Sequence, residues 1–385
     1  MKVAIVHDNV GEFGGAERVV LALSEMFPDA PIYTAFKRKG PFLDRLKGRK
    51  IIASWAQNIP FFSTKLHSPL RFLAPWIWGS FDFSKYELVI SSASWYITKG
   101  FGSRNETRDT RHVTRKPVEI CYIHTPPRWL YGYDTPLGDR NIFVKIYKNI
   151  LAHFLRIYDF EAAQRVNYFV ANSENVAARV EKFYRREAIV IYPPIEIPNS
   201  KLQITNGKKD YYLIISRITG GKGIEMAVRA AKKLKIKMKI AGGVSGYSQT
   251  HEWLKKNAVG DIEYLGYVTD EEQAKFYSEA KAFLALERDV DFGMTPVEAM
   301  VYGAPVIAYN SGGYSESVID ATRDTRHATR STGVLFEDYT VEGLVAAIKR
   351  FEKIKFDEDV LRGHAKKFSK ERFKKEILGF VKGVL

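Results

Sequence analysis

A basic turn near the middle of the chain combines residue types that suit the binding of a diphosphate. Residues 216–230 read SRITGGKGIEMAVRA, in which Arg217 ends a predicted strand and Lys222 stands just before a predicted helix. An arginine, a lysine and the unpaired N–H groups of a helix N-terminus can together hold a diphosphate. Open α/β sheets bind ligands at the carboxyl ends of their strands, which favours this function over a merely solvated basic turn.

The stretch ERDVDFGMTPVEAMVYGAPVIAY, residues 287–309, holds a second group of candidates. Thr295 is expected to cap a helix, with Pro296 at its first position and Glu298 in its first turn. Glu298 is then either the acidic member of a capping box or an acceptor for the hydroxyl groups of a ribose. The glycine turn NSGGYSE, residues 310–316, follows the next predicted strand and would offer further N–H groups to the same ligand.

Two more candidates lie in the first half of the chain. His124 directly follows a predicted buried strand in CYIHTPPRWLYGYD. A histidine exchanges protons or hydrogen bonds near neutral pH, although a histidine at a strand end is often structural. The sequence GEFGGAERVV, residues 11–20, opens a helix after the first strand, and its glycines allow close approach to an anion, although any tight strand-to-helix turn needs glycine. Its spacing is not the G-x-G-x-x-G of dehydrogenases.

Short β-branched runs alternate with amphipathic helical patterns, which indicates βαβ units around parallel sheets and therefore an α/β fold. Residues 192–210 are rich in Pro, Asn, Gly and Lys and are typical of a linker between two domains. The tail, residues 357–385, is predicted to be helical, and it can pack on its own domain or return to the first. The predicted strands are KVAIVHD, PIYTAF, ELVISSAS, EICYIHT and YFVANS in the first half, and YYLIISR, KMKIAGG, IEYLGYV, AFLALE and APVIAY in the second.

One internal repeat stands apart from these elements. TRDTRHVTR, residues 107–115, returns as TRDTRHATR, residues 322–330, with one difference and without similarity in the flanking sequence. Each copy carries three arginines and one aspartate, so the two segments are either anion-binding loops or related insertions that surface loops tolerate. We favour the second interpretation.

The overall composition restricts the class of protein. The chain has 385 residues, enough for two domains, and 59 basic against 44 acidic residues, a formal charge of +15. This excess favours anionic partners. The single cysteine, Cys121, excludes a disulfide framework. The N-terminus resembles a strand rather than a signal peptide. No apolar run reaches the ~20 residues that span a bilayer. We therefore expect a cytoplasmic protein.

Three segments of the first half mix cations with aromatic and aliphatic residues. Such mixtures can lie in a membrane interface, with the cations toward anionic lipid, or they can be core helices with solvated lysines. Their crowding into one half favours peripheral contact with a membrane, and the absence of a known binding module disfavours nucleic acid. The segments are FKRKGPFLDRLKGRK, FFSTKLHSPLRFLAPWIWGSFDF and NIFVKIYKNILAHFLRIYDF.

Taken in order, these motifs make the chain resemble the retaining glycosyltransferases of the glycogen-synthase-like family (glycosyltransferase family 4), of the mannosyltransferase type. The resemblance implies a GT-B fold, in which two Rossmann-like domains face each other across a cleft and the C-terminal helix crosses back to the first domain. The expected divisions are residues 1–195, a linker 196–210, residues 211–370 and a crossover helix 371–385. The motifs that carry the resemblance are GGAERV, CYIHTPPRWLY, VANSENVAARV, YPPIE, SRITGGKGIEMAVRA, AGG and DFGMTPVEAMVYGAPVIAYNSGGYSESV.

The resemblance also implies roles for particular residues in binding a nucleotide sugar without a metal or another cofactor. Arg217 and Lys222 would stabilise the departing diphosphate, and Glu298 would hold the donor ribose. His124 would contact the donor sugar or steady the developing oxocarbenium ion. The remaining donor-binding positions would be two glycines of the first domain and a run of residues in the second, namely Gly14, Gly15, Asp291, Phe292, Gly293, Met294 and Thr295.

Val290 departs from the family pattern. The family places a glutamate eight positions before the residue that Glu298 matches, and that acid contacts the hydroxyl groups of the donor sugar. Loss of a charge-assisted hydrogen bond of about 1.5–3 kcal/mol would slow turnover by roughly one to two powers of ten. Asp289 or Asp291 is a candidate replacement after a small shift of the loop.

The sequence therefore predicts a metal-independent retaining glycosyltransferase that takes mannose from GDP-mannose and builds a cell-surface glycan on a lipid-linked acceptor at the inner face of the plasma membrane. Two alternatives stay open, a nucleotide-sugar-binding protein with impaired catalysis, because of Val290, and a nucleotide-sugar epimerase of the same architecture. A role in nucleic-acid binding is a more distant alternative.

Overall fold

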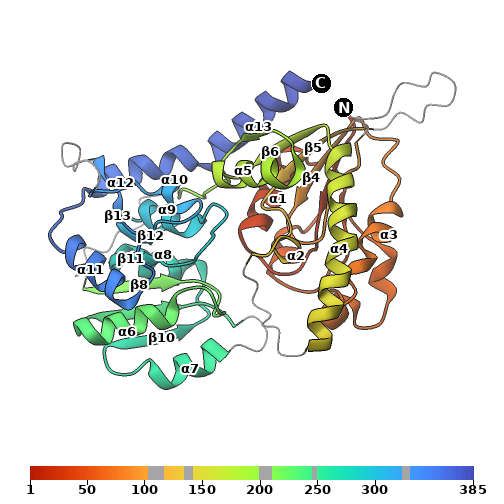
Figure 1. The fold of residues 1–385 in the computed structure, drawn as a ribbon. Coiled ribbons are helices and arrows are strands. Elements are labelled where there is room, and N and C mark those ends of the chain that lie inside the picture. Colours follow the sequence, from red (N-terminus) through yellow and green to blue (C-terminus); the bar gives the residue numbers. More distant parts are fainter. Residues whose placement is uncertain (103–116, 134–141, 199–209, 245–248, 323–329) are drawn as a thin grey trace. The chain divides into compact units, whose positions relative to one another are not determined.

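The computed structural model describes residues 1–102, 117–133, 142–198, 210–244, 249–322 and 330–385, without the side chains of residues 142–148. The chain forms two compact units (Figure 1), of which the first is Met1–Pro194 with Glu371–Leu385 and the second is Ile195–Lys370. The first copy of the arginine-rich repeat and all of the second except its two end residues lie outside the described residues.

The first unit contains a seven-stranded sheet in the order β3-β2-β1-β4-β5-β6-β7. Every neighbouring pair is parallel. The strand order reverses between β1 and β4, and such a switch point is where open parallel sheets bind ligands. The strands are β1 Val3–His7, β2 Ile32–Thr34, β3 Ile51–Ala53, β4 Leu88–Ala93, β5 Val118–Ile123, β6 Tyr168–Ala171 and β7 Ala188–Val190.

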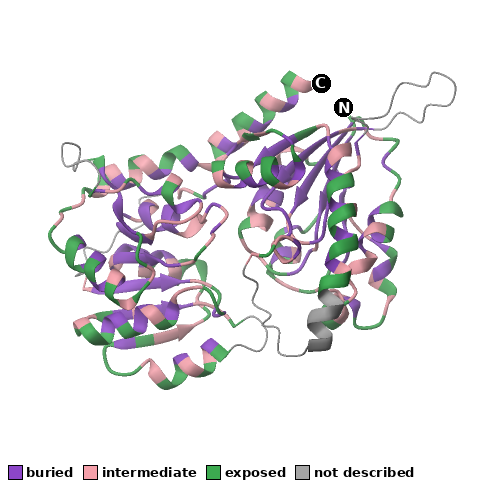
Figure 2. Cartoon of the chain, in the orientation of Figure 1, coloured by how far each residue is buried: buried purple, intermediate pink, exposed green. Residues whose placement is uncertain are grey.

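Helices cover both faces of this sheet, so its central strands β1 and β4 are buried on both faces (Figure 2). Along β1 the side chains alternate, so that Ile5 packs in one cluster with Val20 of α1, whereas Val6 packs in another with Trp78 of α3. The helices are α1 Gly15–Met26, α2 Pro41–Arg45, α3 Ala74–Gly79, α4 Ile142–Arg165 and α5 Glu174–Tyr184, with short turns η1 Trp55–Asn58, η2 Phe62–Leu66, η3 Arg71–Leu73 and η4 Arg128–Leu130.

The second unit is built around a six-stranded parallel sheet in the order β10-β9-β8-β11-β12-β13. Its order reverses between β8 and β11. The strands are β8 Tyr211–Ile215, β9 Lys237–Ala241, β10 Ile262–Gly266, β11 Ala280–Ala285, β12 Val306–Tyr309 and β13 Gly333–Phe336. The helices are α6 Ile224–Leu234, α7 Gln249–Asn257, α8 Asp270–Glu279, α9 Met294–Val301, α10 Tyr314–Ser317, α11 Val341–Phe351 and α12 Glu358–Ala365, followed by the turn η6 Lys366–Phe368.

The tail is two helices rather than one. After η6, Ser369 is extended and forms a bridge with Ile195, whose N–H donates to the Phe368 carbonyl over 2.8 Å. The last helix, α13 (Lys370–Val384), then joins the core of the first unit through Phe373, Ile377 and Val381. Burial of each of these side chains stabilises that unit by about 1.5–3 kcal/mol.

The expected fold of two Rossmann-like parallel sheets is confirmed. All the strands predicted from the sequence are present, and three further strands, β3, β7 and β13, were missed. These three lie at sheet edges. β3 and β7 have three residues each and none of them is buried, whereas the equally short β2 is fully buried and continues into further apolar residues.

Candidate functional site

Three polar side chains meet at the carboxyl ends of neighbouring strands in the first unit. His7 ends β1, Ser92 lies near the end of β4, and His124 directly follows β5. The Ser92 Oγ atom lies 3.1 Å from Nδ1 of His7 and 2.9 Å from Nε2 of His124. All three side chains are buried. One hydroxyl group therefore links two imidazoles at the switch point of the sheet.

Glu17 extends this network toward the glycine turn. Its Oε1 atom lies 3.6 Å from Nε2 of His7, and its Oε2 atom accepts a hydrogen bond of 2.9 Å from the N–H group of Gly14. Gly14 is the N-cap of α1 and Gly15 is its first residue. The Gly14 N–H group is thus already bonded, which leaves the turn fewer donors for a phosphate than the sequence led us to expect.

The two histidines differ in protonation. Burial disfavours a charged His7, but the hydrogen bond and charge of Glu17 outweigh burial and raise the pKa of His7. Burial, reinforced by the charge of His7 and partly opposed by Glu17, lowers the pKa of His124 to about 3. His124 is therefore neutral at pH 7, and the raised pKa makes His7 the more basic of the two imidazoles.

Nδ1 of His7 faces both the hydroxyl oxygen of Ser92, at 3.1 Å, and its carbonyl oxygen, at 3.4 Å. We assign the Ser92 hydroxyl as the donor to Nε2 of the neutral His124, which places the His124 proton on Nδ1. Among the described residues no hydrogen-bond partner is found for this Nδ1 atom. The backbone of His124 is held on both sides, because its N–H donates to Ala93 over 2.9 Å and its carbonyl accepts from Asn172 over 3.1 Å. His124 is thus a buried, neutral imidazole with a fixed backbone.

The basic turn of the second unit joins β8 to α6. The side chain of Arg217 is exposed and makes no hydrogen bond or ion pair in the part of the chain that the structure describes, whereas its carbonyl accepts a hydrogen bond of 3.0 Å from the N–H group of Thr219. Lys222 instead forms a salt bridge with Glu287, which follows β11. Gly223, the N-cap of α6, has φ +71°, and a Cβ atom there would lie 2.5 Å from the Cβ atom of Leu286. The turn therefore packs closely on the end of β11, with one of its two cations neutralised.

The start of α9 differs from the sequence prediction. The helix begins at Met294, and its N-cap is Gly293 with φ +81°, so Thr295 is not the cap. Glycine takes this cap position because it adopts a left-handed conformation that a threonine would resist. Glu298 is consequently not a member of a capping box, and it is buried, with the Tyr277 hydroxyl of α8 at 3.4 Å from Oε2.

The Val290 loop and the glycine turn after β12 form one tightly packed structure. The Val290 carbonyl accepts a hydrogen bond of 3.1 Å from the N–H group of Gly313. A Cβ atom on Gly312 would lie 2.0 Å from that carbonyl oxygen, and one on Gly313 would lie 2.3 Å from the Cα atom of Phe292. The valine side chain is only 6% exposed, so it fills a buried position rather than facing solvent.

The predicted residues of the second unit gather at one edge of its sheet. β8, β11 and β12 are neighbours, and their carboxyl ends lead into the Arg217–Lys222 turn, the loop before α9 and the glycine turn. Asp291, Gly293, Met294 and Thr295 are partly exposed there, whereas Phe292 is buried. Their contact with a ligand stays a prediction, as do the roles of Gly14, Gly15 and His124.

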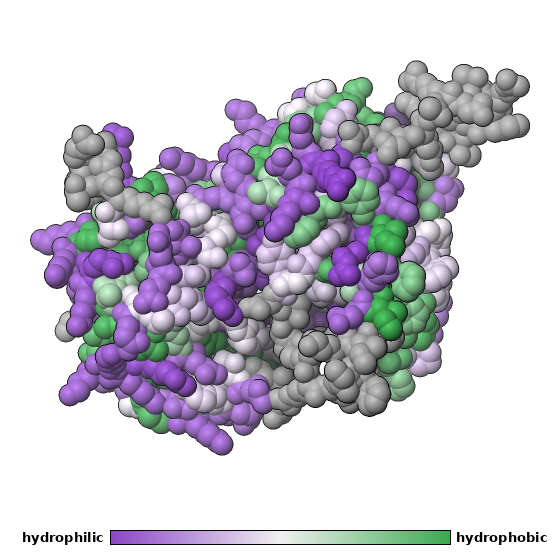
Figure 3. Space-filling model, viewed as in Figure 1, coloured by the Kyte–Doolittle hydropathy of each residue, from purple (hydrophilic) through white to green (hydrophobic). Residues whose placement is uncertain are grey.

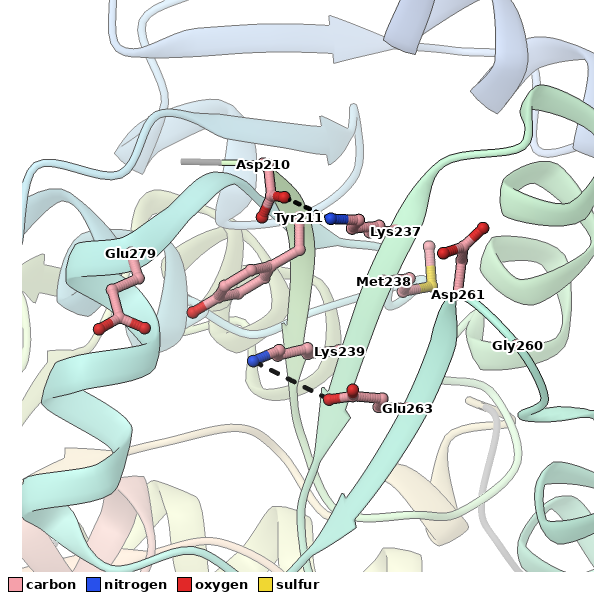
Figure 4. A pocket seen from close by; sticks show the side chains of 9 residues that line it. All are labelled: Asp210, Tyr211, Lys237, Met238, Lys239, Gly260, Asp261, Glu263 and Glu279. Carbon is pink, nitrogen blue, oxygen red and sulfur yellow. Dashed lines mark hydrogen bonds and ion pairs between the residues drawn. The ribbon is translucent and has the colours of Figure 1, made fainter. Parts of the chain in front are cut away.

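A hollow of ≈ 400 Å³ lies at the opposite edge of this sheet, where β8, β9 and β10 begin (Figure 4). Its lysines are paired, Lys237 with Asp210 at 2.6 Å and Lys239 with Glu263 at 3.9 Å. Asp261 and Glu279 add further negative charge. Carboxylates thus outnumber cations, which makes this hollow unsuited to a diphosphate.

The described residues contain neither a cluster of metal ligands nor a membrane-spanning helix. No group of three or more His, Cys, Asp or Glu side chains there is arranged to hold a metal ion. No helix in the same residues has the length and apolar character needed to cross a membrane.

Comparison with known proteins adds independent information. A family described as "Glycosyl transferases group 1" matches residues 198–372. An uncharacterised glycosyltransferase of Methanocaldococcus jannaschii is 28% identical over 148 residues, which cover 38% of this chain and 41% of that protein's length. The alpha-1,3/1,6-mannosyltransferase ALG2 of Candida glabrata is 23% identical over 435 residues, which cover 98% of this chain and 91% of that relative.

Among solved structures, Anabaena HepE in complex with UDP and glucose superposes with a TM-score of 0.67 at 16% identity, over 100% of both chains. At this identity the likeness shows the fold, which is that of GT-B glycosyltransferases. The comparisons therefore show a fold of two Rossmann-like parallel sheets, and the group 1 family matches less than half of the chain, mostly within the second unit.

Proposed function

We propose that the protein is a retaining glycosyltransferase that transfers mannose from GDP-mannose to a lipid-linked or growing glycan acceptor in the synthesis of a cell-surface polysaccharide. The observation that carries this proposal is the family match over residues 198–372, the span that contains the basic turn and Glu298. The choice of mannose rests on the distant ALG2 relatives and on the resemblance of the motifs.

In the proposed reaction the bond between the anomeric carbon and the donor phosphate breaks as the acceptor hydroxyl oxygen bonds to that carbon from the same face. The hydroxyl proton passes to the departing phosphate. Arg217 and Lys222 stabilise the growing charge on the diphosphate, so that the reaction needs no metal ion. Arg217 suits this role because its side chain is exposed and unpaired within the described residues.

Glu298 and His124 are assigned to the other parts of the donor. Glu298 accepts hydrogen bonds from the ribose hydroxyls, and its placement beside Tyr277 restricts its rotation. His124 donates from Nδ1 to a hydroxyl group of the sugar. A neutral imidazole can perform this task throughout the physiological pH range because the pKa of His124 is about 3.

The test begins with thermal-shift measurements of the purified protein against GDP-, UDP- and ADP-sugars, since a ligand that binds the folded state raises its melting temperature. The preferred donor is then assayed for transfer to a lipid-linked acceptor, with and without a chelator. Arg217→Ala is expected to lose donor binding, whereas Lys232→Ala, a matched exposed lysine on α6, is expected to retain it. If no nucleoside diphosphate stabilises the protein, the proposal is wrong.

A second candidate function is donor binding with impaired catalysis, which the buried Val290 side chain favours. Val290→Glu would restore the missing acceptor, and Val290→Ala would remove packing without adding one. This candidate would be supported if the wild type were nearly inactive and Val290→Glu, but not Val290→Ala, raised turnover about tenfold or more. Interconversion of the free donor without acceptor, followed by NMR, would instead indicate an epimerase.

A further inference from the structure

The first unit has a groove on its surface that is lined by apolar and aromatic side chains. The groove has a volume of ≈ 370 Å³ and lies between the η3–α3 segment and α4. Every side chain that lines it is apolar or aromatic, including Phe72, Pro75, Trp76, Leu151, Phe154 and Tyr158. An exposed apolar groove on a protein whose surface is otherwise charged is typical of a surface that binds a protein partner or a membrane.

The exposed side of α4 extends this apolar surface. Ile150, Phe154 and Ile157 are 57%, 66% and 49% exposed, and their spacing of four and three residues places them on one face of the helix. A surface helix is normally polar on its outer face. Here Leu155 and Ala162 already bury the inner face, so α4 is apolar on both sides.

Two tryptophans stand at the edge of the groove. Trp76 of α3 is 63% exposed and Trp55 of η1 is 43% exposed, and the Trp55 indole donates a hydrogen bond of 3.4 Å to the Trp76 carbonyl. Figure 3 shows hydrophobic side chains gathered over α3 and α4 at the right of the view. Exposed tryptophans beside aliphatic side chains are typical of proteins that lie in a bilayer interface.

The charge of the two segments that build this surface identifies what covers it. Among the described side chains of these segments, residues 55–81 and 149–158, there are three cations, Lys65, Arg71 and Arg156, and no carboxylate, whereas the exposed Glu161 lies one turn further along the same face of α4. The whole chain carries a formal charge of +15. A second copy of the chain would bring like charge to this face, whereas an anionic bilayer would neutralise it.

We propose that this surface, comprising the groove, the exposed face of α4 and the two tryptophans, docks the protein on an anionic membrane, with Trp76 and Phe154 inserted among the lipid chains. This inference deepens the proposed function, because a lipid-linked acceptor would be met at the same membrane. Docking itself needs neither a donor nor transfer, so the two proposals can fail separately.

The test uses flotation of the full chain with vesicles of phosphatidylcholine alone or mixed with phosphatidylglycerol. Binding to the mixed vesicles and weak binding to phosphatidylcholine are expected. Trp76→Ala combined with Phe154→Ala should weaken partition about tenfold or more, since each exposed side chain loses its burial in lipid. Lys65→Glu should weaken binding to the anionic vesicles only, and added salt should do the same.

A matched double variant, Val259→Ala with Leu378→Ala, removes exposed apolar side chains outside this surface, 59% and 39% exposed, and should bind as the wild type does. Circular dichroism and the thermal shift with donor should be unchanged in the Trp76/Phe154 variant, which separates docking from folding and from donor binding. Wild-type flotation in that variant, or no flotation of the wild type, would overturn the inference. So would a dimer in solution that the same variant abolishes, because the face would then bind a second copy.

Discussion

The Nε2 atom of His124 lies 2.9 Å from the Oγ atom of Ser92, so that one hydroxyl group stands between two buried imidazoles. Glu17 raises the pKa of His7, whose Nδ1 atom lies 3.1 Å from the same hydroxyl oxygen. Nε2 of His124 is thus engaged within the first unit, and Nδ1 is the nitrogen that we propose meets a ligand.

Replacing Ser92 by alanine should change the chemistry of His124 more than its position. The variant leaves Nε2 of His124 and Nδ1 of His7 without their shared partner, and we expect kcat to fall about tenfold with a small change in the KM of the donor. Nitrogen NMR of His124 should show a mixture of tautomers. Ser92→Cys, which keeps a weak donor, should recover part of the rate. A fall in melting temperature with an unchanged tautomer would mean that Ser92 is only structural.

His124 should make the first unit sensitive to acid. An unfolded histidine binds a proton near pH 6.5, whereas folded His124 stays neutral down to about pH 3. Between these values the unfolded state binds more protons, so the free energy of unfolding falls as the pH falls, by about 2 kcal/mol at pH 5. His7, whose pKa is raised, contributes with the opposite sign.

Differential scanning calorimetry at pH 7 and pH 5 would measure this effect. His124→Asn cannot take up a proton, so its melting temperature should fall less between the two pH values than that of the wild type. Equal losses in both proteins would contradict the low pKa of His124.

The salt bridge between Lys222 and Glu287 should restrain diphosphate binding. Glu287→Gln removes the competing charge, and we expect GDP to bind about threefold to tenfold more tightly, with the gain larger at low salt. Lys222→Met should weaken binding about tenfold. Lys232→Met, on the helix α6 that follows this turn, serves as the control in calorimetric titrations. Weaker binding by Glu287→Gln would show that the carboxylate positions the lysine instead of neutralising it.

A methyl group on Gly312 should disrupt the packing of the glycine turn on the Val290 loop. Gly312 has φ +56°, and its Cβ atom would meet the Val290 carbonyl oxygen at 2.0 Å. We expect Gly312→Ala to destabilise the second unit by about 2 kcal/mol or more and to weaken donor binding. Gly220→Ala, where no atom lies within 4 Å of the added carbon, should have little effect. Calorimetry and limited proteolysis would compare the two.

The sequence was most informative where hydrophobic pattern and strand position coincide. The central strands were predicted because their buried positions form mainly apolar runs between turn signals, whereas the short edge strands β3 and β7 have no buried residue. His124, Arg217 and Lys222 could be placed at strand ends by the same reasoning.

The rest of the candidate site depends on contacts across the sheet. His7 and Ser92 are 85 residues apart, and Lys222 and Glu287 are 65 apart, so only the strand order brings each pair together. The start of α9 was misplaced because Gly293 takes the cap position through its backbone conformation, which the Thr-Pro pair hid. His7 could have been found from its position, because it is a polar residue at the carboxyl end of β1, beside the switch point of the sheet.

The return of α13 to the first unit has a consequence for biosynthesis. Phe373, Ile377 and Val381 complete the hydrophobic core around β1, yet they are translated after the whole of the second unit. During synthesis the part of the core around β1 that α13 covers is therefore exposed while the ribosome makes the intervening 176 residues, Ile195–Lys370. A nascent chain stalled before residue 371 should accordingly be a client for chaperones, and the two units cannot be separated by a single cut into independently complete halves.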